Sequence, residues 1–78
     1  MNRANYEIVD AAEDHILIRD IGPWDMFMTV TNAAEEVVAE LAPMLAGRRL
    51  EYIDSDGRRD RILVKDGRFA GFELLPQP

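Results

Sequence analysis

The sequence contains no cysteine and only one histidine among its 78 residues. Without thiols the chain cannot form disulfides, hold an iron–sulfur cluster or use thiolate catalysis. Zinc sites draw mainly on several cysteine or histidine ligands, so a zinc centre is disfavoured as well. The glycines do not form a phosphate-binding loop. We therefore expect no metal, no cofactor and no catalytic residues.

The sequence also lacks a long apolar run. No stretch approaches the roughly 18 consecutive apolar residues of a membrane span, and the first ten residues lack the apolar run of a signal peptide. We expect no membrane association and a cytoplasmic location.

Length and composition indicate one small α+β domain over residues 1–78. Hydrophobic residues make up 47% of the chain and charged residues 31%, which is too apolar for intrinsic disorder. We expect such a domain to be stable by at most about 5 kcal/mol unless a partner adds surface. Proline cannot donate to a strand ladder, so Pro76 and Pro78 predict a loose tail over residues 75–78.

The net charge of -6 is unevenly divided along the chain. Residues 1–46 hold two basic and nine acidic side chains, whereas residues 47–78 hold seven basic and six acidic ones. Phosphate backbones repel an acidic protein, which disfavours nucleic acid as a partner. The late arginines could still form a basic patch for an acidic partner, or they could be solvated charges on edge strands. The candidates are Arg48, Arg49, Arg58, Arg59 and Arg61.

Periodicity predicts the element order β-β-α-β-β-β. Two β-branched runs at 6–10 and 15–19 predict an N-terminal hairpin, and runs at 49–54, 61–66 and 69–74 predict a meander. The pair Asp66-Gly67 predicts a hairpin turn with positive φ. The predicted fold is one amphipathic helix packed on a mostly antiparallel sheet.

The helix is predicted from apolar residues at helical spacing, which are Ala34, Val37, Val38, Leu41 and Leu45. Thr31 or Asn32 is the predicted N-cap, and Asn32 with Glu35 has the spacing of a capping box. Pro43 predicts a kink or an early stop near Ala42, and Gly47 suits the position after the helix end.

Strand alternation predicts which side chains lie under the helix. They are Ile16, Ile18, Leu50, Tyr52, Ile62, Val64, Phe72 and Leu74. The opposite face would then expose Leu17, Ile53, Leu63 and Phe69 among charges. Exposed apolar side chains favour association. We expect a protein partner or self-association, one form being a homodimer through this open sheet face.

The segment before the helix holds the only tryptophan, a phenylalanine and two methionines. Such side chains are enriched at protein interfaces, which favours a partner-binding loop. The alternative is a loop that folds back and plugs the core. The residues concerned are Trp24, Asp25, Met26, Phe27 and Met28.

Two further clusters have a chemical and a structural interpretation. His15 next to Asp14 could act as a general base, with Ser55, Thr29 or Thr31 as the hydroxyl, or it could be a partly exposed residue at a strand end. The Asp54 to Asp60 segment could bind a hard cation, but Arg58 and Arg59 oppose a dication. A β-turn with aspartate as a local hydrogen-bond acceptor explains the same residues.

One resemblance concerns the region from about Leu17 to Phe72. It is carried by Ile18–Asp20 with Gly22–Asp25, by Thr29–Glu35 with Val37 and Val38, by Gly47–Leu50 with Tyr52, Asp54, Ser55 and Gly57, and by Gly67–Phe69 with Gly71 and Phe72. With these residues the chain resembles a family of short bacterial proteins of unknown function. The resemblance implies a free-standing bacterial protein and brings no activity, cofactor or site residue.

These observations predict a small non-enzymatic interaction or regulatory module that acts through surface complementarity. One alternative is a nucleic-acid or nucleoprotein accessory protein that uses the late arginines. Another is a small ligand-binding protein or hydrolytic enzyme that uses His15 and the neighbouring acids.

Overall fold

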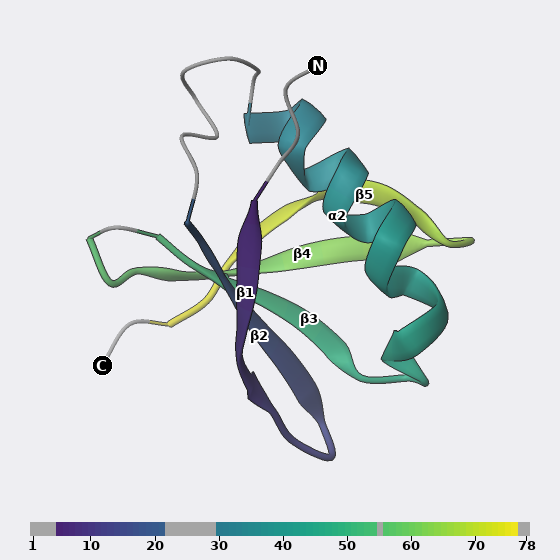
Figure 1. Ribbon diagram of the computed structural model, residues 1–78, viewed down its shortest axis with the longest axis horizontal. Helices are drawn as coiled ribbons and strands as arrows, with labels where there is room; N and C mark the ends of the chain where they lie inside the picture. The colour runs from purple at the N-terminus through teal and green to yellow at the C-terminus, as the bar shows by residue number, and fades with distance from the viewer. Residues whose placement is uncertain (1–4, 22–29, 55, 77–78) are drawn as a thin grey trace.

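The computed structural model describes residues 5–21, 30–54 and 56–76 (Figure 1). Within these ranges one helix and five strands follow one another in the predicted order, and the fold class is confirmed as α+β. The elements are β1 (Tyr6–Ala11), β2 (His15–Asp20), α2 (Val30–Leu45), β3 (Arg49–Ile53), β4 (Arg59–Lys65) and β5 (Arg68–Leu74).

The five strands form one sheet in the order β1-β2-β3-β4-β5. All neighbouring pairs are antiparallel except β2 and β3, which run parallel with His15 opposite Arg49. Parallel neighbours require a crossover connection, and α2 supplies it. The helix therefore lies on one face of the sheet, and no other described element covers the opposite face (Figure 1).

The hydrophobic core lies between α2 and the sheet, as predicted. The buried helix residues are Ala33, Ala34, Val37, Val38, Leu41 and Leu45, and the buried sheet residues beneath them are Ile16, Ile18, Leu50, Tyr52 and Ile62. Two side chains predicted to lie under the helix are much less covered, since Phe72 is 38% and Leu74 64% exposed. They belong to β5, an edge strand with a sheet neighbour on one side only.

The helix begins earlier than predicted, and at its other end the predicted early stop near Ala42 does not occur. It begins at Val30, so Thr31 and Asn32 lie inside it and the predicted N-cap is wrong. It also continues through Pro43 to Leu45. A proline removes one backbone hydrogen bond, but burial of Leu41 and Leu45 on either side offsets that loss. Gly47 follows the helix end with φ +84°, as predicted.

The hairpin of β4 and β5 contains the predicted turn and one irregularity that was not predicted. Asp66 and Gly67 have φ of 54° and 76°, as a type I′ turn requires. A bulge lies where Leu63 pairs with Gly71 but Val64 pairs with Phe69. The extra residue turns Phe69 to the helix side. There its ring packs against the ring of Phe72, with 5.2 Å between the two ring centroids. The prediction of Phe69 on the open face is therefore wrong.

Two further predictions concern the chain end and the membrane. Strand β5 ends at Leu74, as expected, while Gln77 and Pro78 lie outside the described residues. Within the ranges the structure describes, no helix is both long and apolar enough to cross a membrane.

Candidate functional site

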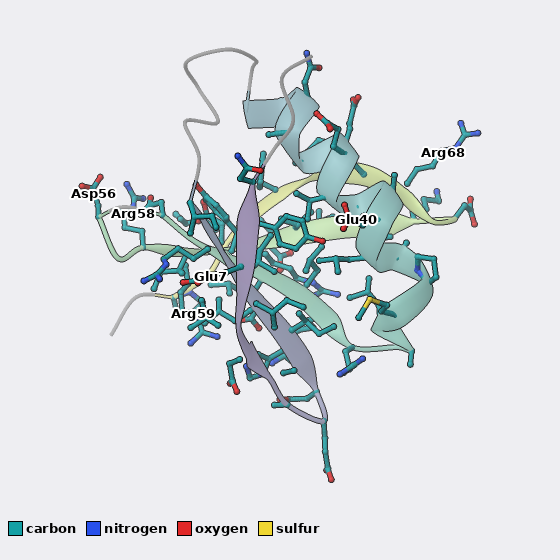
Figure 2. The ribbon with its side chains drawn as sticks, in the orientation of Figure 1. Glu7, Glu40, Asp56, Arg58, Arg59 and Arg68 are labelled. Atoms are coloured by element: carbon teal, nitrogen blue, oxygen red, sulfur yellow. The ribbon has the colours of Figure 1, made fainter. Side chains whose placement is uncertain are left out.

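The sheet face opposite α2 is the main candidate surface, and we call it the helix-free face. Strand alternation and register place charged side chains on most of its positions. Figure 2 labels Glu7 and Arg59 to the left of α2, which carries Glu40. Its residues are Glu7, Asp10, His15, Leu17, Arg19, Arg49, Glu51, Ile53, Arg59, Arg61, Leu63, Lys65 and Glu73.

The apolar side chains of the helix-free face are more covered than the sequence predicts. Leu17 is only 7% exposed, and Ile53 and Leu63 are half-buried. Asp10 and Glu51 are the cross-strand neighbours of Leu17. Long charged side chains lay their apolar stems over such residues and keep their charged ends in water. The expected exposure of Leu17 is therefore wrong.

Glu51 lies at the centre of this face and is almost completely buried. Its side chain is 5% exposed and accepts hydrogen bonds from Arg49 Nε at 3.0 Å and from Arg59 Nη2. Burial by itself raises the pKa of Glu51, but the hydrogen bonds from the two arginines outweigh it and leave the pKa below its ordinary value. The carboxylate thus stays charged and fixes both guanidinium groups in position.

His15 connects the β1–β2 hairpin to this centre. Its Nδ1 lies 2.8 Å from Asp14 Oδ1 and its Nε2 lies 3.1 Å from Asp10 Oδ2. A carboxylate only accepts hydrogen bonds, so both contacts are satisfied by the doubly protonated ring. The hydrogen bond to Asp14 raises the pKa of His15, burial opposes it, and the bond to Asp10 adds to the rise. Arg49 binds Asp14 as well, at 3.2 Å.

The contacts of His15 argue against its role as a general base in this arrangement. Both ring nitrogens of His15 contact carboxylates, so neither is open to a substrate proton in this arrangement. Of the candidate hydroxyls, Ser55 and Thr29 lie outside the described residues and Thr31 lies in α2. Asp10 and Glu51 were not singled out from the sequence, because their contacts depend on how β2 pairs with β1 and β3.

The stability of the protein should decrease as the pH rises through the pKa of His15. The pKa of His15 in the folded protein is raised above its value in the unfolded chain, about 6.5. The contribution of His15 to the free energy of unfolding is therefore complete below the unfolded pKa and is lost as the pH rises through the folded pKa. We expect wild type to exceed His15→Gln in unfolding free energy by more at about pH 5 than at about pH 8.5, measured by urea denaturation. Equal differences at the two pH values would contradict this assignment.

The pKa of Asp14 makes the stability of the protein depend on pH in the opposite direction, on the acid side. Hydrogen bonds from His15 and then Arg49 lower it, so its contribution is present at neutral pH and lost as the pH falls through the folded pKa.

The predicted basic patch is distributed over several structural roles. Arg48 donates from Nε to the Leu45 carbonyl at 2.8 Å and so satisfies the helix end. Arg49 and Arg59 converge on Glu51, while Arg61 lies 3.9 Å from Glu73. The Arg58 side chain is exposed at the turn before β4. Arg49, Arg59 and Arg61 thus share the helix-free face, and the first two bind one carboxylate. Binding of a partner by these arginines stays a prediction.

The Asp54 segment forms the predicted turn. Asp54 Oδ1 accepts hydrogen bonds from the backbone N–H groups of Asp56 and Arg58, both at 2.9 Å. The carboxylate is therefore the local acceptor of an Asx-type turn. Asp60 lies on the helix side of β4, opposite Tyr52.

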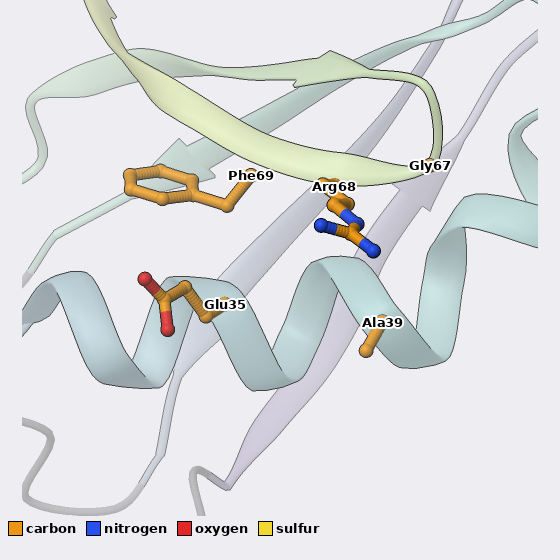
Figure 3. Close-up of a pocket in the computed structure, with 5 residues that line it drawn as sticks. All are labelled: Glu35, Ala39, Gly67, Arg68 and Phe69. Carbon is orange, nitrogen blue, oxygen red and sulfur yellow. The ribbon is translucent and has the colours of Figure 1, made fainter.

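A shallow groove of about 330 Å³ lies between α2 and the β4–β5 turn (Figure 3). Glu35 and Ala39 line it from the helix, and Gly67, Arg68 and Phe69 line it from the hairpin. Glu35 and Arg68 are both exposed. The volume is at the low end of the roughly 300–1,000 Å³ typical of ligand pockets, so the groove could hold only a small group.

The predicted partner-binding loop, Trp24–Met28, lies outside the described residues, so the choice between core plug and recognition loop stays open. No family model, curated protein or solved structure matches the chain. The resemblance to short bacterial proteins therefore stays a prediction.

Proposed function

We propose that the protein is a small, non-enzymatic interaction module of the cytoplasm that binds a protein partner through its helix-free face. The observation that carries the proposal is a five-stranded sheet face over which no described element lies. On this face the half-buried side chains of Ile53 and Leu63 lie among arginines of β3 and β4, which are Arg49, Arg59 and Arg61. Arginine is enriched at protein interfaces, and energetically dominant contacts sit where a surrounding rim excludes water.

The ion pairs within this face support the proposal because they hold its arginine side chains in place. Glu51 fixes Arg49 and Arg59, and Glu7 pairs with Arg19 at the β1 edge. Ordering a free arginine on binding costs roughly 0.5–1.5 kcal/mol, and a side chain already held avoids part of that cost. The face is therefore preorganised.

The charge of the face indicates the kind of partner. Its cations are Arg19, Arg49, Arg59, Arg61 and Lys65, and His15 adds a charge when protonated. The carboxylates of the face, and Asp14 beside it, are already engaged by His15 and the arginines, whereas Lys65 has no ion-pair partner among the described residues. Complementary potentials favour association and like potentials oppose it. A partner with an acidic surface thus fits better than a second copy of the same face.

A nucleic-acid accessory role is the second candidate, favoured by the cations Arg59, Arg61 and Lys65 along β4. Two observations weigh against it. Glu51 and Glu73 flank Arg61 in the register. The described residues of this face also include no phenylalanine, tyrosine or tryptophan on which a base could stack. Binding of labelled single-stranded DNA or RNA at about 50 mM salt, measured by fluorescence anisotropy, would favour this candidate.

The test compares two leucines on opposite faces of the same hairpin. Leu63→Asp alters the helix-free face, while Leu74→Asp makes the same change at an exposed position on the helix side. Each tagged variant would be used for quantitative capture from cells, after circular dichroism has shown that it folds. We expect Leu63→Asp to capture about tenfold less of a partner that the wild type enriches. Leu74→Asp should capture the same amount as the wild type. The reverse pattern would place the interaction surface on the helix side.

A further inference from the structure

Leu63 is an apolar position on the helix-free face that is not fully buried. It lies in the middle of β4, half-buried, and its cross-strand neighbour on β5 is Gly71. Gly71 has no side chain and a φ of +122°, and a Cβ built there would meet no atom within 4 Å. The space beside Leu63 therefore stays open on the β5 side.

Cations surround Leu63 on its other sides. Arg61 and Lys65 lie two residues before and after it on β4 and so point to the same face. The pairing of Leu50 with Ile62 places Arg49 across from Leu63 on β3. We call Leu63, Gly71, Arg61 and Lys65 the Leu63 seat.

Two of these cations are available to a partner. Lys65 is exposed and has no ion-pair partner among the residues that the structure describes. Arg61 is approached by Glu73 only at 3.9 Å, and both side chains are partly in water. Arg49, by contrast, is held by Asp14 and Glu51. The seat thus presents an apolar centre with one available positive charge on each side along the strand.

We infer that the Leu63 seat binds an extended partner segment in which an apolar residue is flanked, two positions away on each side, by carboxylates. The inference rests on the proposed function and names the chemistry of the partner. Each strand residue advances about 3.3 Å, so Arg61 and Lys65 each lie about 6.6 Å along β4 from Leu63. An extended segment has the same rise and points alternate side chains to one side. The pattern acid-x-apolar-x-acid therefore matches the spacing of the seat, with its apolar side chain over Gly71.

The test uses two acetylated peptides of identical composition. Glu-Ser-Leu-Ser-Glu points both carboxylates to the side of its leucine, and Ser-Glu-Leu-Glu-Ser points them away. Each is titrated into isotopically labelled protein and followed by NMR. We expect the first peptide to bind about fivefold more tightly, to shift the Leu63, Lys65 and Gly71 signals, and to weaken between about 50 and 300 mM salt.

A matched pair of variants provides the control. Lys65→Glu and Arg58→Glu make the same charge change at exposed positions, and only Lys65 belongs to the seat. Lys65→Glu should weaken binding of the first peptide about fivefold, and Arg58→Glu should change it less than about twofold.

Three results would overturn the inference. They are equal binding of the two peptides, binding of neither, or displacement of the first peptide by a single-stranded oligonucleotide that binds the seat more tightly. If Leu63→Asp still loses its captured partner in that case, the proposed function stands and the inferred peptide pattern alone is wrong.

Discussion

Replacing both Arg49 and Arg59 by methionine should destabilise the protein by about 3 kcal/mol, because it leaves the carboxylate of Glu51 buried and unpaired. Methionine keeps most of the apolar stem, so the change removes mainly the two guanidinium groups. Against a total of at most about 5 kcal/mol, this loss would leave about 2 kcal/mol, so a few per cent of the molecules would be unfolded at 25 °C. Urea denaturation followed by circular dichroism measures it.

Two controls distinguish a buried charge from lost packing. In the double variant the arginines no longer oppose the effect of burial, which should raise the pKa of Glu51 above its value in the unfolded chain. The loss of unfolding free energy relative to the wild type should therefore shrink as the pH falls towards about 4. Adding Glu51→Met should restore most of the stability, because a buried ionic group replaced by apolar side chains is often neutral. A defect that neither acid nor the third substitution relieves would show that Glu51 is not the cause.

Shortening Leu50 to alanine should cost about 3 kcal/mol, whereas shortening Leu74 should cost less than about 0.5 kcal/mol. Leu50 is 1% exposed in the core, between Ile16 on β2 and Ile62 on β4. Leu74 is exposed on β5, at the sheet edge. Both changes remove the same atoms, so the difference reports burial under α2. Similar losses in urea denaturation would mean that the helix does not cover the Leu50 face.

The elements and the core followed well from local sequence patterns. The alternation of β-branched residues indicated the strands, and the spacing from Ala34 to Leu45 indicated the buried face of α2. The Asp66-Gly67 pair correctly predicted the last hairpin turn, because few other residue pairs adopt two positive φ angles. Local sequence carries these features because each depends on neighbouring residues alone.

Features that depend on register were not predicted. The bulge opposite Leu63 moved Phe69 to the helix side, and nothing in the strand alternation marks such an insertion. The helix ran past Pro43 because tertiary burial outweighed a local preference.

The centre of the candidate surface was missed for the same reason. Glu51 lies next to Leu17 only because α2 brings β3 parallel to β2, and the Asp10 contact with His15 requires the irregular pairing of β1. The sequence marked single arginines as candidates, but their ion-pair partners come from strands distant in sequence. An interaction surface built across a sheet is therefore visible only after the strands are paired.

The most direct test of the interaction surface is methyl NMR on leucine-labelled protein during titration with a captured partner. Leu63 reports the helix-free face, Leu74 the helix side and Leu50 the core. We predict that the Leu63 methyl signals shift or broaden at substoichiometric partner while those of Leu74 keep their positions. Changes at Leu74 with an unaffected Leu63 would contradict binding through the helix-free face.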